Sequence, residues 1–483
     1  MRGTMGHVVA ALCLATAVLC STAIAQKIPT ETWMGVYLGQ TRIGYSKFAI
    51  DKSEYQGKPG YRLESSSSTR ISALGVEVEQ TLDTVVYLDS NFNPLRQVFR
   101  MSSGGHSMSI NADFRPEEIV AEAISEGTRS TKNIPIPKGA KLVSDTTYLP
   151  LGTQLKVGDK VSYMWFNPVT MTLDNLELEV LRKEELKLGP EVFQAFVIKS
   201  TSSAGEMMCW QDENGELLKV QAVAGILMIR ESKEEAMAGA TGTYSPPADL
   251  AVMTSAATDK RIPNPRKVKS MRVLLSGITE DSLVLQDDRQ KIERRSEEGV
   301  IEYSIKAAEL NTSKTLLLPF PKAGMSDYLA DTAYIQPSNS DISRTAQKII
   351  GDEKNTGKIV SKIRAWVNKN MRPRGDIGIL RTSVDILHAK SGVCRDYAIL
   401  YTALARSVGI PTRLISGLVY WKGGFYYHAW AESYVGQWVP VDATLDTDFV
   451  DATHIKLAQG DVNVMFQTAK TMGAIKADII EWK

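Results

Sequence analysis

The sequence has little cysteine, no excess charge of either sign and no hydrophobic run long enough for a transmembrane helix. Lysine and arginine number 56 against 55 aspartates and glutamates, so the basic excess of a nucleic-acid-binding protein is missing. Beyond the N-terminus, no stretch reaches the ~18 apolar residues that a membrane span requires. We therefore expect neither a nucleic-acid partner nor an integral membrane segment in the mature protein.

The N-terminus predicts a signal peptide that covers residues 1–25. Arg2 supplies a positive charge, residues 8–20 form an apolar run, and Ala23-Ile24-Ala25 is a small-x-small cleavage signal before Gln26. The apolar run is too short for a membrane span, although an uncleaved N-terminal anchor is the alternative. We expect the mature protein to be periplasmic or secreted.

Removal of this leader leaves two of the four cysteines, Cys209 and Cys394, and a net charge of zero. Two thiols are too few for a disulfide framework or a zinc cluster, and no cofactor is predicted. Cys209 lies in the apolar run EMMCWQ, which favours a buried and inert thiol. A disulfide between the two is the alternative in an exported protein, but we expect Cys394 to be free.

Residues 26–245 are predicted to form one or more antiparallel β-rich domains. Segments rich in Val, Ile, Tyr, Phe and Thr are separated by turn residues, and Asn214-Gly215 is a strong hairpin signal. The motif VYLDSNFNPLRQV near Tyr87 resembles CWQDENGELLKVQ near Trp210 at a constant offset. This similarity indicates an internal duplication, although a common hairpin pattern recurring by chance would give the same similarity.

A change of composition follows the β-rich region. Residues 246–267, rich in Ala, Thr, Ser and Pro, are predicted to be a linker, and residues 268–320 a small β-rich segment. From residue 340 to residue 483 the spacing of apolar residues becomes helical and then strand-like, which predicts a separate C-terminal domain. The remaining length agrees with about three domains.

Cys394 stands at the beginning of a predicted helix. Apolar residues continue at helical spacing to Val408, and Gly409-Ile410-Pro411 ends the helix. Unpaired backbone N–H groups and the positive end of the helix dipole stabilise a thiolate at this position. The same N–H groups could bind the oxyanion of a tetrahedral intermediate. Asp396 lies in the same turn, where we expect its charge to oppose thiolate formation.

His428 and Asp442 lie on two predicted strands that follow this helix, and their relative position depends on the loop between the strands. A two-residue loop, Gly436-Gln437, places Asp442 on the face opposite to His428. A three-residue loop that also includes Val435 sets Asp442 opposite Trp430. His428 then lies diagonally on the same face, ~7 Å away between Cβ atoms. A catalytic triad therefore requires the three-residue loop or a bulge.

Triad chemistry assigns a role to each of the three residues. Cys394 attacks an amide or peptide carbonyl, His428 accepts the thiol proton and returns it to the leaving amine, and Asp442 orients the imidazole. The resulting thioester is resolved either by water or by an amine.

Four motifs in residues 340–461 resemble those of the transglutaminase-like superfamily. They are Gly392-x-Cys394-x-Asp396-x-Ala398, Gly409-Ile410-Pro411, His428-Ala429-Trp430 and Asp442-Ala443-Thr444, and the segment from Asp451 to Asp461 also resembles the tail of many bacterial members. The resemblance implies an α+β chain whose C-terminal domain has a papain-like core, with the nucleophile helix packed on an antiparallel sheet.

The resemblance implies a thiol-dependent enzyme acting on a protein or peptide substrate, as a peptidase or amidase or as a transglutaminase. A non-catalytic binding or scaffold protein of the cell envelope, with a degenerate domain, is the alternative. Two further features are predicted to be non-catalytic. His454 is expected to be structural, and Asp446, Asp448 and Asp451 are expected to form a solvated acidic loop, with a calcium site as the alternative.

Overall fold

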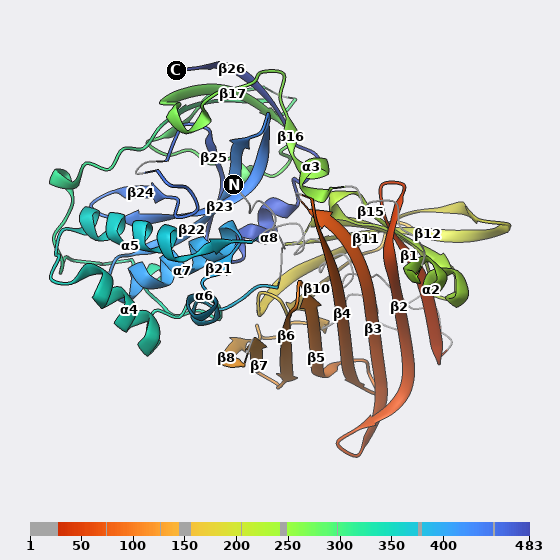
Figure 1. Ribbon diagram of the computed structural model, residues 1–483. Coiled ribbons are helices and arrows are strands. Elements are labelled where there is room, and N and C mark those ends of the chain that lie inside the picture. The colour runs from red at the N-terminus through yellow and green to blue at the C-terminus, as the bar shows by residue number, and fades with distance from the viewer. Residues whose placement is uncertain are drawn as a thin grey trace. The chain divides into compact units, whose positions relative to one another are not determined.

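The computed structural model describes residues 28–73, 75–125, 127–143, 156–203, 205–241, 249–296, 298–374, 379–447 and 450–483. The predicted signal peptide lies outside these residues. The described chain forms two compact units, one ending at Asp249 and one running from Leu250 to Lys483 (Figure 1). In the described part of the chain, no helix combines the length and the apolar character needed to cross a membrane.

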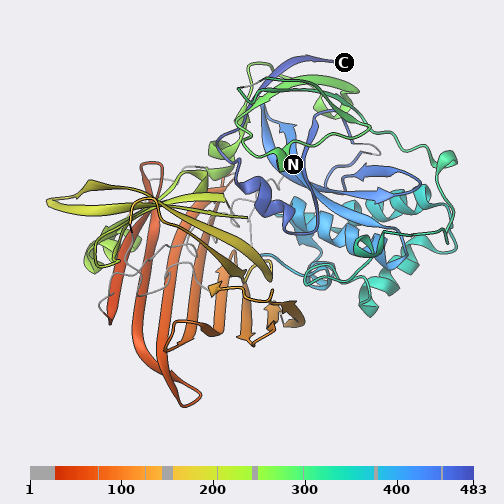
Figure 2. The ribbon, with the colours of Figure 1, turned by 180° about the vertical axis from the view of Figure 1, so that it is seen from behind.

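The N-terminal unit is built on one sheet of fifteen strands, in the order β8-β7-β6-β5-β4-β3-β2-β1-β15-β14-β13-β12-β11-β10-β9. Along β4 and β7, buried residues alternate with less buried ones, as expected for strands with one face toward a core. The long hairpins β2–β3 and β11–β12 extend beyond their neighbours (Figure 1, Figure 2). The strands are β1 (Thr30–Leu38), β2 (Thr41–Tyr55), β3 (Lys58–Ala73), β4 (Val76–Asp89), β5 (Pro94–Ser103), β6 (His106–Phe114), β7 (Glu118–Ser125), β8 (Thr128–Pro135), β9 (Leu142–Val143), β10 (Lys160–Asn167), β11 (Thr172–Leu188), β12 (Glu191–Ser202), β13 (Gly205–Gln211), β14 (Leu217–Gln221) and β15 (Ile226–Glu231).

The two halves of this sheet contain hairpins of the same design at the positions of the sequence repeat. In the β4–β5 loop, Asp89 Oδ1 accepts hydrogen bonds from the backbone N–H groups two and four residues on, and Asp212 does the same in the β13–β14 loop. Three residues after each aspartate the backbone has a positive φ, 63° at Phe92 and 77° at Gly215. A bulge precedes each loop. The two hairpins thus share one loop geometry, which both an internal duplication and a common hairpin pattern recurring by chance would give.

The C-terminal unit contains a five-stranded antiparallel sheet covered by helices. Strands β16, β23, β22 and β25 lie in that order, and β24 pairs with β23. Helix α7 packs on β22 and β23, and α8 packs on β22 and β25. The elements are β16 (Ala256–Ala257), β22 (Thr412–Trp421), β23 (Gly424–Tyr434), β24 (Trp438–Val441), β25 (His454–Gly460), α4 (Ser340–Ile350), α5 (Thr356–Asn370), α6 (Ser383–Ala389), α7 (Cys394–Ser407) and α8 (Val464–Ala469).

From Leu250 on, the segments predicted as a linker and as a separate small β-rich region belong to the C-terminal unit. Within 246–267, β16 adds an edge strand to β23. Within 268–320, β17 (Ser270–Ser276), β18 (Gln290–Arg295) and β19 (Ile301–Lys306) form a second sheet with the last strand, β26 (Lys476–Trp482). Composition alone did not reveal these pairings, because each partner strand lies far along the chain. The remaining α-helices and strands of the described residues are α2 (Lys233–Thr241), α3 (Leu250–Thr254), β20 (Arg372–Pro373) and β21 (Ser391–Gly392).

Candidate active site

Cys394 is the first residue of α7, as the sequence predicts. Val393 before it has an extended backbone, with φ −97° and ψ 176°, so the chain turns into the helix at the thiol. Strand β21, which immediately precedes Val393, pairs in parallel with β20. The Cys394 side chain is fully buried and forms no disulfide, and Cys209 in the N-terminal unit is likewise buried and free.

Asp396 caps the start of this helix and is paired with a buried arginine. Its Oδ2 accepts a hydrogen bond from the backbone N–H of Val393 at 3.0 Å and another from Arg381 Nη2 at 2.8 Å. Burial raises the pKa of Asp396, but the charges of Arg381 and Arg395 lower it. Their combined effect is larger, so the pKa lies below its ordinary value. The expected opposition of Asp396 to a thiolate is therefore countered by two adjacent cations.

Gly392 is required by this arrangement. A Cβ atom at position 392 would lie 2.3 Å from Asp396 Oδ2 and 2.8 Å from Arg381 Nη2, much closer than such atoms approach in proteins. The pattern Gly-x-Cys-x-Asp thus has a local physical basis: glycine makes room for the aspartate that caps the helix carrying the cysteine.

Replacing Asp396 with alanine is expected to destabilise the C-terminal unit by about 3–5 kcal/mol, because Arg381 would stay buried without its counter-charge. The two side chains are only 4% and 3% exposed. Chemical unfolding followed by a C-terminal probe would measure this loss. Asp281→Ala is a matched control, because Asp281 forms an ion pair with Arg295 in the same unit while 82% exposed, and such surface pairs contribute about 0–1 kcal/mol. Equal losses in the two variants would contradict this account.

The register of β23 and β24 is the one that a triad requires. Tyr434 opposes Trp438 and Ala431 opposes Val441, so Val435, Gly436 and Gln437 form a three-residue loop. Gly436 adopts a φ of 111° in this loop, a conformation that favours glycine. The predicted three-residue loop is confirmed, and His428 and Asp442 lie on the same face of the sheet.

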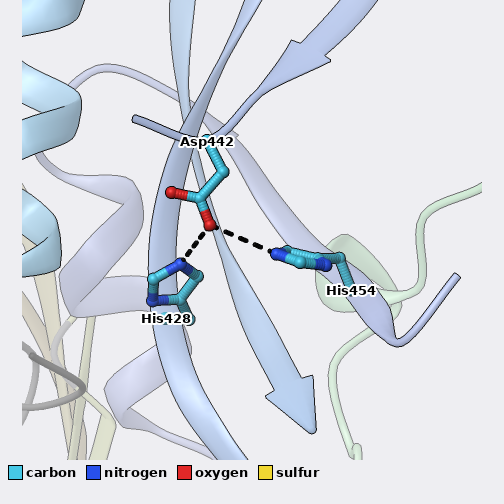
Figure 3. Close-up of side chains that lie close together, drawn as sticks. All are labelled: His428, Asp442 and His454. Atoms are coloured by element: carbon cyan, nitrogen blue, oxygen red, sulfur yellow. Dashed lines mark hydrogen bonds and ion pairs between the residues drawn. The ribbon is translucent and has the colours of Figure 1, made fainter. Parts of the chain in front are cut away.

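His428 and Asp442 are joined by a short hydrogen bond. The distance from His428 Nε2 to Asp442 Oδ2 is 2.8 Å (Figure 3). The other carboxylate oxygen, Oδ1, accepts from the backbone N–H of Thr444 at 2.8 Å, which fixes the carboxylate plane. Cys394 lies close enough to His428 to contribute to raising the pKa of the imidazole. The imidazole is thus hydrogen-bonded to the carboxylate, with the Cys394 side chain beside it.

The environment favours a charged imidazole next to a charged carboxylate. Burial lowers the pKa of His428, but the charge and hydrogen bond of Asp442, together with Cys394, raise it to about 9. Burial raises the pKa of Asp442, but the charges and hydrogen bonds of His428 and His454 lower it well below its usual range. The pair is therefore an ion pair at neutral pH, in which Asp442 stabilises the imidazolium form of His428.

His454 is a partner of Asp442 that the sequence interpretation did not identify. Its Nε2 lies 3.3 Å from Asp442 Oδ2, the oxygen that also contacts His428 (Figure 3). Asp451 is 1% exposed and lies 3.4 Å from the other nitrogen of His454, so the predicted solvated loop is wrong for this residue. Asp446 is exposed, and Asp448 lies outside the described residues. The spacing Asp451-x-x-His454 at the start of a strand is the sequence pattern that could have indicated this acid–imidazole pair.

His428, Asp442 and His454 together have the composition of a metal site, since their ligand atoms all lie within 4.8 Å of one another. Two imidazoles and a carboxylate suit zinc or iron. The Nε2 atoms of His428 and His454, however, already lie at hydrogen-bond distance from the same oxygen, Asp442 Oδ2. The two imidazoles are thus held by one carboxylate oxygen through hydrogen bonds.

A small cavity reaches Asp442 from the side of α5 and β24. Its volume is about 20 Å³, room for about one water molecule, and its walls include Val360, Arg364, Val441 and Val450. A peptide side chain cannot enter a space of this size. Because the Cys394 thiol is itself buried, a substrate can reach it only after neighbouring residues move.

Comparison with known proteins agrees with the division into two units. Residues 343–443 match the transglutaminase-like superfamily, and residues 34–227 match a family described as a protein of unknown function (DUF3108). An uncharacterized protein of Mycobacterium leprae (strain TN) is 29% identical over 133 residues, which are 26% of this chain and 47% of that protein. The chain thus spans about half the length of this relative.

Two solved structures are similar to parts of the chain. A candidate cysteine protease of Cytophaga hutchinsonii has a TM-score of 0.31 and 19% identity, and the match covers 45% of this chain and 86% of the other. A Brucella abortus protein of the unknown-function family DUF1849 has a TM-score of 0.32 and 10% identity, covering 43% of this chain and 97% of the other. The family match over residues 343–443 leads to one identification: the C-terminal part of this chain is a transglutaminase-like domain.

Proposed function

We propose that the protein is an exported thiol enzyme that acts on amide bonds of proteins or peptides through Cys394, His428 and Asp442. The observation that carries this proposal is the buried hydrogen bond between His428 and Asp442 beside Cys394, the first residue of α7. The match of this region to the transglutaminase-like superfamily supports the same chemistry. The export rests on the sequence of residues 1–25.

The reaction proceeds in two stages. In the reacting form the thiol proton already resides on His428 as an imidazolium, so Cys394 Sγ attacks the carbonyl carbon as a thiolate, and the helix N–H groups stabilise the oxyanion. The C–N bond then breaks, and the proton on His428 goes to the departing amine, leaving a thioester on Cys394. His428 next takes a proton from water or from an acceptor amine, and that nucleophile releases the acyl group and regenerates the thiol.

Hydrolysis is the preferred outcome of the second stage. Transfer to an amine requires a site that admits the amine while it excludes water, and the described residues include no feature built for this purpose. The enzyme is therefore proposed as a peptidase or amidase, with transglutamination as the variant reaction of the same intermediate.

One observation favours a second function, that of a non-catalytic binding or scaffold protein of the cell envelope. Cys394 is 0% exposed and His428 only 3% exposed, so the thiol is closed to a substrate in this conformation. In this alternative, the partner would be recognised by the N-terminal sheet, and the cysteine would serve packing alone. The two functions differ in whether the thiol becomes reachable in solution.

Incubation of the mature protein with a casein-like substrate and a labelled primary amine would test the proposal. Fragments would identify a peptidase, and incorporation of the amine would identify a transferase. Either product must disappear in the Cys394→Ala variant. If the wild-type protein and this variant give the same result over a series of protein and peptide amides, the proposed enzyme function is refuted for these substrates and the scaffold function is favoured.

A further inference from the structure

The buried cluster around Asp442 extends past the three residues of the proposed triad. His454 and Asp442 share a hydrogen bond of 3.3 Å, and His454 is completely buried. On its other side lies Asp451, whose Oδ2 pairs with Arg266 Nη1 at 2.9 Å. A line of alternating charges and imidazoles therefore continues from Asp442 into the interior of the C-terminal unit.

We propose that His454 is a positioning residue, which holds the Asp442 carboxylate in the orientation that serves His428. The inference rests on the proposed function, and it adds a residue outside the segment that matches the transglutaminase-like superfamily, residues 343–443. Asp442 Oδ2 is hydrogen-bonded to the imidazoles of His428 and His454, while Oδ1 accepts a hydrogen bond from the backbone N–H of Thr444. With three fixed partners, the carboxylate cannot rotate away from His428.

His454 is itself held firmly, which a positioning residue requires. Arg289 donates through Nη2 to the backbone carbonyl of His454 at 2.7 Å and to that of Asp451 at 2.9 Å. Trp430 packs edge-to-face against the His454 ring, with centroids 5.4 Å apart and an angle of 87°. Backbone and ring are thus both restrained, so that Nε2 stays aimed at Asp442.

The sheet contains a special feature that lets His454 approach. Gly417 on β22 is opposite His428, and a Cβ atom there would lie 2.0 Å from the Ile455 carbonyl oxygen and 2.9 Å from the Trp430 ring. A register shift between β22 and β25 occurs at the same position. The glycine allows β25 to come close enough for its first residue to reach the acid of the triad.

A set of four proteins tests this role: wild type, His454→Gln, His454→Asn and His454→Leu. A glutamine amide can reach the position of Nε2 and donate to Asp442, whereas an asparagine amide reaches only the position of Nδ1, next to Asp451. We expect His454→Asn and His454→Leu to lower kcat by about tenfold to a hundredfold with little change in KM, since misplacing a catalytic group by about 1 Å has such an effect. His454→Gln should restore most of the activity. His388→Leu, which changes a histidine that is 60% exposed, is the control.

A readout that needs no turnover separates this inference from the proposed function. The described chain contains only four histidines, so ¹⁵N-histidine NMR can follow the His428 Nε2–H that faces Asp442. We expect this signal to be retained in His454→Gln and shifted in the folded His454→Asn and His454→Leu proteins. A wild-type protein without activity but with this pattern would refute the enzyme and support the positioning role. Unchanged His428 signals in both the Asn and Leu variants, or losses of kcat that follow thermal stability equally in all three variants, would refute the positioning role.

Discussion

Replacing Cys394 with alanine is expected to lower turnover of an amide substrate by a factor of about 10⁴ or more, because the bond-forming atom is removed. The protein should remain folded, since loss of one sulfur from a buried position leaves only a small cavity. Steady-state rates with equal concentrations of folded protein would measure the effect.

Cys209→Ala provides the matched control for this prediction. Cys209 is also free, also 0% exposed, and lies on β13 in the N-terminal unit. The two variants lose the same atom from equally buried positions, so packing losses are comparable. Retained activity in Cys394→Ala, or equal loss in both variants, would show that Cys394 is not the nucleophile.

Asp442→Asn has the second-largest expected effect, a loss of about 10³–10⁴ in kcat, as expected when the acid that orients a triad histidine loses its charge. Asparagine can offer either an oxygen or an NH₂ group to His428, so the imidazole loses both its fixed tautomer and its counter-charge. Activity measurements and NMR of the His428 ring in the same samples would check this prediction.

The same variant should change the titration of His428 in a defined direction. Its pKa is about 9 in the folded protein, against an ordinary value of 6.5, because Asp442 outweighs the effect of burial. Without that charge, burial is opposed only by Cys394, and the NMR midpoint should fall well below 9. Because the folded-state value is raised, the stabilisation from the pair is fully present below pH 6.5 and disappears as the pH rises through 9. A midpoint that stays near 9 in Asp442→Asn would contradict this account.

The positions of the candidate residues could be predicted because their signals are local. Cys394 lies between Gly392 and a run of apolar residues at helical spacing, and both features act within a few residues. Whether His428 and Asp442 share a face of the sheet depends on whether the loop between their strands has two or three residues. The three-residue loop that a triad needs is the one observed. Strand alternation likewise revealed the β-rich character of the N-terminal unit.

The features that were missed depend on contacts between distant parts of the chain. Arg266 lies in the segment predicted as a linker, yet it pairs with Asp451, which changes an apparently solvated acid into a buried one. His454 reaches Asp442 only because β25 pairs with β22. A buried polar group needs a partner, but the sequence does not identify that partner when the two lie far apart. The same limit applies to β1 and β15, whose pairing joins the two halves of the N-terminal sheet.

Competitive labelling of the two cysteines tests the central claim most directly, because they are equally buried in one molecule. The mature protein would be treated with iodoacetamide near neutral pH, and the modification of Cys394 and Cys209 followed over time by peptide mass spectrometry. We expect Cys394 to react much faster than Cys209, and this advantage to be lost in His428→Ala. Equal protection of the two thiols, or a Cys394 rate that is unchanged in His428→Ala, would mean that the imidazole does not activate the sulfur and that the domain is a scaffold.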